Sequence, residues 1–156
     1  MPARPYAFPR SRRLKRRRLL RPLFDRARPD VGRVRVGPVV LLARTVARAD
    51  TGCDTPVQVC FAPGRVVRGV GRVRLRRVMR ETFRLHQQPL LDAVAGRQDA
   101  LTLVVLYRGA AATAEADVVR CLPEALRRAA LRATPPHADP RATPSGAPRT
   151  PGPQAT

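Results

Sequence analysis

The sequence has few acidic residues, and almost no lysine among its basic ones. It contains 11 Asp plus Glu against 31 Lys plus Arg, a formal charge of +20, and Lys15 is its single lysine. A charge so one-sided repels itself in a compact chain unless a polyanion neutralises it. A GC-rich genome could explain arginine in place of lysine, but not the excess of basic over acidic residues. Because the planar guanidinium binds phosphate with two hydrogen bonds, we expect a nucleic acid partner.

Metal-ligating and disulfide-forming residues are also scarce. The three cysteines, Cys53, Cys60 and Cys121, form no CxxC pair, and His86 and His137 complete no metal-ligand spacing. We therefore expect buried, reduced thiols and neither a zinc site nor a disulfide framework. No paired carboxylates, Ser-His-Asp set or histidine cluster stands out either. We therefore do not expect an enzyme that cuts RNA with its own side chains, and we predict no catalytic residue in this chain.

Long apolar runs are absent. No stretch approaches the roughly 18 residues of a membrane span, so we expect no membrane association. The Arg-rich, acid-free start could belong to an organelle transit peptide. However, Pro5, Pro9 and Pro22 interrupt it and no apolar signal core follows. We therefore expect a cytoplasmic protein.

The length of 156 residues fits one domain with less ordered ends. Residues 1–12 contain three prolines and are expected to form a flexible basic arm. The domain is expected to span residues 13–132. The tail, residues 133–156, is rich in Pro, Ala, Thr and Gly and is expected to be disordered.

Apolar periodicity predicts helices and strands inside the domain. Helices are expected over about residues 13–27, 70–85 and 114–131, and strands over 34–46, 57–62 and 101–108. The last strand is apolar at both parities, which indicates a central strand covered on both faces. Residues 47–56 have the composition of a turn, and residues 90–95 could add a helical turn. This order predicts an α+β structure with helices packed on one sheet.

Glycine and proline punctuate several of these elements. Gly37 and Pro38 interrupt the first β-rich stretch, so it is expected as one bent strand or two short ones. Pro22 falls inside the first predicted helix, which begins late or kinks there. Pro123 divides the last one or starts a new helical segment.

The helix predicted over residues 70–85 has two chemically opposite faces. At 100° per residue, one arc holds the apolar set Leu75, Val78, Met79, Thr82 and Leu85, with Phe83 near its edge. The opposite arc holds Arg72, Arg76, Arg77, Arg80 and Arg84, with Arg74 at a boundary and Val73 in its middle. Stacked like charges destabilise an isolated helix by about a few tenths of a kcal/mol per pair. A phosphate backbone would offset that repulsion, whereas the alternative is a solvated face of a buried helix.

Upstream of this helix, arginine alternates with glycine. Arg65 and Arg68 stand among Gly64, Gly69 and Gly71. Glycines let a backbone approach closely, and a helix start offers free N–H groups to phosphate. The segment is not a P-loop, because its spacing is wrong and the Lys-Ser/Thr pair is missing.

The segment RVRLRRVMRE, residues 72–81, resembles the hallmark of the protein subunit of bacterial ribonuclease P. Arg72 and Arg74 match its two leading arginines, residues 76–77 its basic pair, and Arg80 its later arginine. Val73 stands where the hallmark has asparagine, and this replacement removes a polar group. The likeness extends over about residues 10–132, and its first helix resembles RLKRRRLLRPLF. There Phe24 and Leu20 occupy the two aromatic positions, and leucine removes a base-stacking surface.

This resemblance implies a fold and a division of labour. The fold would be an αβββαβα two-layer structure with one four-stranded sheet, similar to ribosomal protein and elongation factor domains. In the family an RNA subunit with bound Mg²⁺ cuts the 5′ leader from precursor tRNA, and the protein assists without requiring another protein partner. The implied RNA-binding residues here are Arg65, Arg68, Arg72, Arg74, Arg76, Arg77, Arg80 and Arg84. The implied leader-binding cleft would include Leu20, Phe24, Val40 and Leu42, for which ordinary core is the alternative.

Two other classes of protein share parts of this pattern. A ribosomal or ribosome-associated RNA-binding protein would have the same charge and the same α+β layout. A DNA-binding architectural protein is a third possibility, but the chain lacks a heptad, helix-turn-helix or zinc pattern. The RNA that copurifies with the protein would distinguish a ribonuclease P protein from a ribosomal one.

Overall fold

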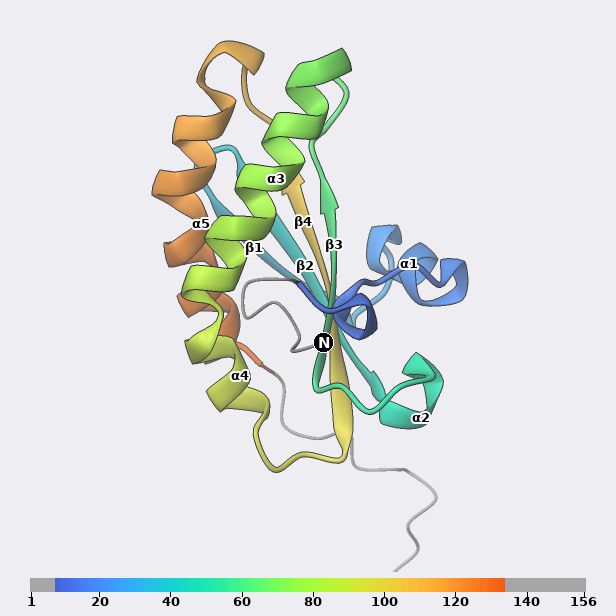
Figure 1. The fold of residues 1–156 in the computed structure, drawn as a ribbon. Helices are drawn as coiled ribbons and strands as arrows, with labels where there is room; N and C mark the ends of the chain where they lie inside the picture. Colours follow the sequence, from blue (N-terminus) through green and yellow to red (C-terminus); the bar gives the residue numbers. More distant parts are fainter. Residues whose placement is uncertain (1–7, 134–156) are drawn as a thin grey trace, which may run out of the picture.

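A four-stranded mixed sheet organises the computed structural model, which describes residues 8–133 (Figure 1). The strands are β1 (Gly32–Val36), β2 (Val39–Ala47), β3 (Val57–Ala62) and β4 (Asp99–Tyr107), in the spatial order β1-β2-β4-β3. β2 pairs antiparallel with β1 and with β4, whereas β3 pairs parallel with β4. The first seven residues of the expected arm, and the expected tail from residue 134 onward, lie outside the described residues.

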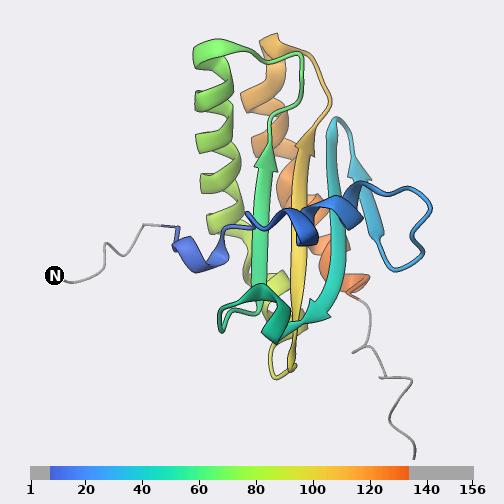
Figure 2. The ribbon, with the colours of Figure 1, turned by 90° about the vertical axis from the view of Figure 1, so that its right-hand side faces the viewer.

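Helices cover both faces of this sheet. They are α1 (Arg17–Phe24), α2 (Arg48–Thr51), α3 (Gly69–His86), α4 (Gln88–Val94) and α5 (Ala114–Leu131). Short 3₁₀ turns cover Arg10–Arg12 and Ala111–Thr113. In Figure 1, α3 and α5 lie side by side on one face, and Figure 2 shows α1 crossing the strands on the opposite face. The predicted αβββαβα order is confirmed, with α2 and α4 as short additions.

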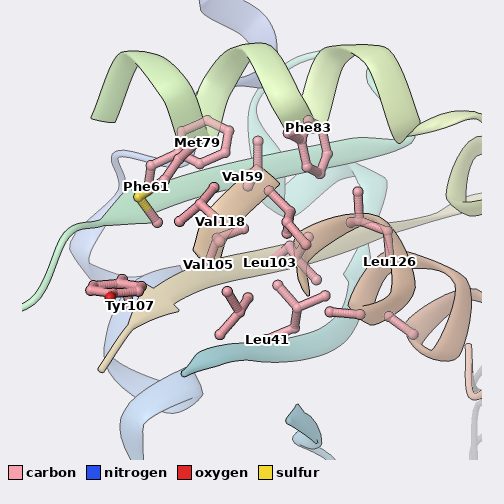
Figure 3. Packing of buried hydrophobic residues seen from close by; sticks show 14 of the residues in the cluster. Leu41, Val59, Phe61, Met79, Phe83, Leu103, Val105, Tyr107, Val118 and Leu126 are labelled. Carbon is pink, nitrogen blue, oxygen red and sulfur yellow. The ribbon is translucent and has the colours of Figure 1, made fainter. Parts of the chain in front are cut away.

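The core has two layers, because side chains alternate along each strand. On the helix side, Leu41, Val59, Phe61, Leu103 and Val105 meet Met79 and Phe83 of α3 and Val118 and Leu126 of α5 (Figure 3). On the other face, Leu42, Val104 and Leu106 meet Leu19 and Leu23 of α1. β4 is buried on both faces, as its sequence predicts, because α3 and α5 cover one face of the sheet and α1 crosses the other.

Of the three internal prolines, only Pro123 has an effect different from the one expected. Gly37, at φ +54°, and Pro38 form the turn between β1 and β2, so the β-rich stretch is two strands. α1 begins late, at Arg17, and contains Pro22 near its end. The expected division of the last helix at Pro123 is wrong, since α5 is continuous. Packing of its buried face against the sheet and α3 outweighs the one hydrogen bond that this proline removes.

The N-terminal segment is part of the domain. Phe8 is 6% exposed, and its ring packs edge-on against Phe61 and Phe83, at centroid distances of 5.9 Å and 6.0 Å. The Leu14 N–H donates to the carbonyl of Val59 at 3.0 Å, so this segment also covers the exposed edge of β3. The expectation of a flexible arm is therefore wrong for residues 8–12. The pairing with β3 also explains why α1 does not begin at residue 13.

The three cysteines are free thiols, as expected, but only Cys121 is buried. Cys53 and Cys60 are half-buried, so the expectation of burial is wrong for both. Cys60 lies on the face of β3 that α1 crosses, next to the apolar layer beneath α1.

Candidate nucleic-acid interface

Helix α3 buries one side against the sheet and presents arginines on the other. It begins at Gly69, whose φ of +57° turns the chain out of the extended conformation at Arg68. Leu75, Met79, Thr82 and Phe83 are buried. The predicted apolar arc is wrong for Leu85, which is 61% exposed, while Phe83 is fully buried. Phe83 packs edge-on against Phe8 and Phe61, and a helical wheel contains neither of these neighbours.

The arginines predicted to bind RNA fall into two groups. In the first, the protein itself engages the guanidinium. Arg84 forms an ion pair with Glu81 at 2.6 Å, Arg74 with Glu115 of α5 at 3.4 Å, and Arg72 donates a hydrogen bond to the carbonyl of Gly64. The Arg84 fork, which makes two hydrogen bonds to Glu81, holds the pKa of that carboxyl below its usual range.

In the second group, no carboxylate neutralises the guanidinium. Among residues 8–133, no acidic side chain forms an ion pair with Arg65, Arg68, Arg76, Arg77 or Arg80. Arg65, Arg68 and Arg77 are exposed, and the other two are half-buried. These side chains are therefore the part of the predicted set whose charge is left for a polyanion.

Arg80 shows how concentrated this charge is. Burial lowers its pKa, and the guanidinium groups of Arg13, Arg76 and Arg77 lower it further. Arg13 comes from the N-terminal segment, where it forms a parallel β-bridge with Val59 of β3, so it joins the cluster from a distant part of the sequence. Sequence reasoning missed it because residue 13 was assigned to a helix rather than to a strand edge.

The face of the sheet that α1 crosses carries an apolar surface beside these arginines. The strand register places Val40, Leu106 and Ala62 in one row, and the next row is Leu42, Val104 and Cys60. α1 packs Leu19 and Leu23 onto this face and leaves Leu20 and Phe24 on one flank. The opposite flank is fixed by Arg18, which donates to the carbonyl of Asp50 at 2.7 Å. We call the surface formed by Leu20, Phe24, Val40, Cys60 and Ala62, with the buried Leu106 beneath it, the open strip.

Only some of the residues predicted to line a leader-binding cleft lie on the open strip. Phe24 is 50% exposed, and Leu20 and Val40 are half-buried on the open strip. Leu42 is 1% exposed in the layer that packs against α1, so it is an ordinary core residue. Cys60 and Ala62 belong to the open strip, and Leu106 lies beneath it, but none of the three was predicted. Only the strand register brings Leu106 and Ala62 into the row of Val40, and Cys60 into the next row.

The open strip adjoins the arginine cluster at β3, which is an edge of the sheet. Burial raises the pKa of the Cys60 thiol, and the nearby Arg76 guanidinium opposes that rise. Arg76 therefore lies close to the strip and provides a positive charge at its β3 end. An apolar surface that ends in a guanidinium suits a single-stranded nucleic acid, whose bases stack on such surfaces while its phosphates need cations.

Comparison with known families decides what this chain is. The profile of the family described as Ribonuclease P matches residues 8–130. The chain belongs to the ribonuclease P protein family. Neither the curated proteins nor the solved structures that were compared contain a match. Membership identifies the chain as a bacterial ribonuclease P protein component and links it to maturation of the tRNA 5′ end.

The ribonuclease P interface does not have the composition of a metal site. Within the part of the chain that the structure describes, no group of three or more His, Cys, Asp and Glu side chains could hold a metal ion. Mg²⁺ prefers carboxylate and other oxygen ligands, whereas the open strip is apolar and its β3 end is cationic. These residues therefore do not fit a Mg²⁺ site. None of the helices within residues 8–133 is long and apolar enough to cross a membrane.

Proposed function

We propose that this ribonuclease P protein binds the ribonuclease P RNA through the outer face of α3, and holds the 5′ leader of precursor tRNA along the open strip. The proposal rests on one observation above all. Arg76, Arg77 and Arg80 carry charges that no acidic side chain pairs with among the described residues, and the open strip begins beside them. A structured RNA offsets their mutual repulsion and releases counterions when it binds.

The proposed division of labour leaves bond cleavage to the RNA subunit. Mg²⁺, bound mainly by that RNA, would support the hydrolysis, and this chain would act through binding alone. Its arginines neutralise phosphates where the two subunits meet. Its open strip adds contacts that precursor tRNA makes and mature tRNA does not, so the protein favours substrate over product. Both RNAs would be met in the cytoplasm.

The arginine assignment is tested by reconstitution with a bacterial ribonuclease P RNA. Arg76→Ala and Arg80→Ala should bind that RNA more weakly, and each should reduce the salt slope by about one unit per lost phosphate contact. Arg84→Ala should have a smaller effect, because Glu81 already engages its fork. Arg127→Ala on α5 removes the same charge from a residue that pairs with Glu124, and is the matched control.

Two outcomes would contradict the assignment. In one, the salt slopes of Arg76→Ala and Arg80→Ala equal that of the wild-type protein while the variants fold normally. In the other, Arg127→Ala weakens binding as much as they do. Copurification provides an independent check, because ribosomal RNA in place of ribonuclease P RNA would favour the ribosomal alternative. Cleavage of a precursor tRNA at low Mg²⁺ then measures whether the protein assists the reaction.

A further inference from the structure

The opposite end of the open strip also carries a positive charge. On β1, Val34 and Val36 pack against the core between the sheet and the long helices. Because side chains alternate along a strand, Arg33 and Arg35 lie on the face that α1 crosses. The register pairs Arg35 with Val40, and so places it in the row of Leu106 and Ala62.

Arg35 is positioned to bind an anion. Its side chain is exposed, and its Nε donates to the carbonyl of Gly37 at 3.2 Å, which steadies the guanidinium at the end of the β1–β2 turn. Neither Nη atom has a hydrogen-bond partner or an ion pair within residues 8–133. Arg44, on the same face, is instead bound to Asp30 at 2.8 Å.

The two ends of the strip are complementary to one extended strand of RNA. Arg76 lies near Cys60 at the β3 end, and Arg35 lies at the β1 end of the adjacent row, which contains Val40, Leu106 and Ala62. Three inter-strand spacings separate β3 from β1, or roughly 14 Å. Apolar surface in the middle accepts bases without reading sequence, and a guanidinium at each end accepts a phosphate.

We propose that Arg35 binds a phosphate of the 5′ leader at the β1 end of the open strip, an inference that rests on the proposed function. A different role is conceivable for an arginine on an edge strand, since charges there discourage pairing with another chain. That role would be shared by Arg33, which lies on the same strand and the same face. Arg33 instead pairs with Leu42, which is buried beneath α1, so its neighbour on β2 is not part of the strip.

The test uses the reconstituted holoenzyme, mature tRNA and precursor tRNAs with leaders of increasing length. Arg35→Ala should leave affinity for mature tRNA unchanged. For leaders long enough to reach Arg35, it should weaken binding of precursor tRNA by about fivefold to tenfold, the size expected of one exposed charge-assisted contact. The salt slope should fall by about 0.7, the value for one phosphate of a single strand. Arg35→Lys should keep that slope, and Arg33→Ala should behave like the wild-type protein.

Each contrary result has a definite meaning. The inference is overturned if Arg35→Ala matches the wild-type protein at every leader length, or weakens mature and precursor tRNA equally. It is also overturned if Arg33→Ala causes the same loss. A wild-type holoenzyme that does not prefer precursor over mature tRNA would instead contradict the proposed function itself. Thermal unfolding of Arg35→Ala should match the wild-type curve, because its side chain is exposed.

Discussion

Two phenylalanines near the N-terminus should have opposite roles, and the same substitution at each separates them. Phe8 is 6% exposed and packs between Phe61 and Phe83, whereas Phe24 is 50% exposed on the flank of α1. Phe8→Ala should therefore destabilise the fold. Phe24→Ala should leave stability almost unchanged and weaken binding of the tRNA leader.

The magnitudes follow from burial. Truncating a buried phenylalanine to alanine costs about 3–5 kcal/mol, and its edge-on ring pairs add about 0.5–1.5 kcal/mol each beyond burial. Phe8 lies at the margin of the core, where the cavity can partly collapse, so we expect about 3 kcal/mol. For a domain of this size that lowers the melting temperature by on the order of 10 °C. Phe24→Ala, at an exposed position, should cost less than about 1 kcal/mol.

Urea unfolding and precursor-tRNA binding, measured on both variants, test this pair. Phe24→Ala should lose part of its preference for precursor over mature tRNA at wild-type stability. Phe8→Ala should lose stability, because Phe8 and Leu14 hold the segment that leads into α1. Any loss of tRNA binding in this variant should follow from that loss of stability. The reasoning is refuted if Phe8→Ala changes the free energy of unfolding by less than about 0.5 kcal/mol, the range of ordinary surface substitutions. An equal loss of mature-tRNA binding in Phe24→Ala would refute its role with the leader.

Three further substitutions test the fold around the interface. Leu42→Ala, in the layer against α1, should cost about 2–5 kcal/mol in urea unfolding, clearly more than Leu20→Ala at its half-buried position. A hydrogen bond from Arg28, together with Arg44, holds the pKa of Asp30 well below its usual range. The stability that Asp30 contributes is therefore present above the unfolded pKa of about 3.9 and is lost as pH falls through the lower folded value. Asp30→Asn should cost less than about 1 kcal/mol at neutral pH and flatten the acid limb of a stability-against-pH curve, whereas an unchanged limb would contradict the pairing. Gly64→Ala should lower the melting temperature more than Gly69→Ala, because both have positive φ but only the added Cβ at Gly64 would meet the Tyr107 carbonyl; equal shifts would contradict this steric argument.

Much of the architecture could be predicted from local pattern. The strand over residues 57–62 and the last helix over residues 114–131 were predicted with the bounds that the structure shows. The central position of the last strand followed from its apolar residues at both parities. Such patterns are readable because burial on one or both faces imposes a period on the chain itself.

Pairing between distant segments decided the features that were predicted wrongly. The short apolar signal of Phe8 has no period, so only its contact with Phe61 and Phe83 reveals that it belongs to the core. The helical wheel placed Leu85 inside because it has no knowledge of which neighbour the helix meets. Pro123 remains within α5 because packing of the surrounding helix outweighs one lost hydrogen bond.

The sequence by itself determined the excess of arginine, the position of the basic helix and the family to which the chain belongs. Only the tertiary structure decided which arginines lack an ion-pair partner among the described residues and are left to bind RNA. Glu115 of α5 pairs with Arg74 of α3, and Glu81 pairs with Arg84 within α3. It also decided that Val40, Leu106 and Ala62 lie in one row across three strands. The physical reason is that charge and polarity belong to each residue, whereas neutralisation and exposure depend on neighbours that the fold brings from elsewhere in the chain.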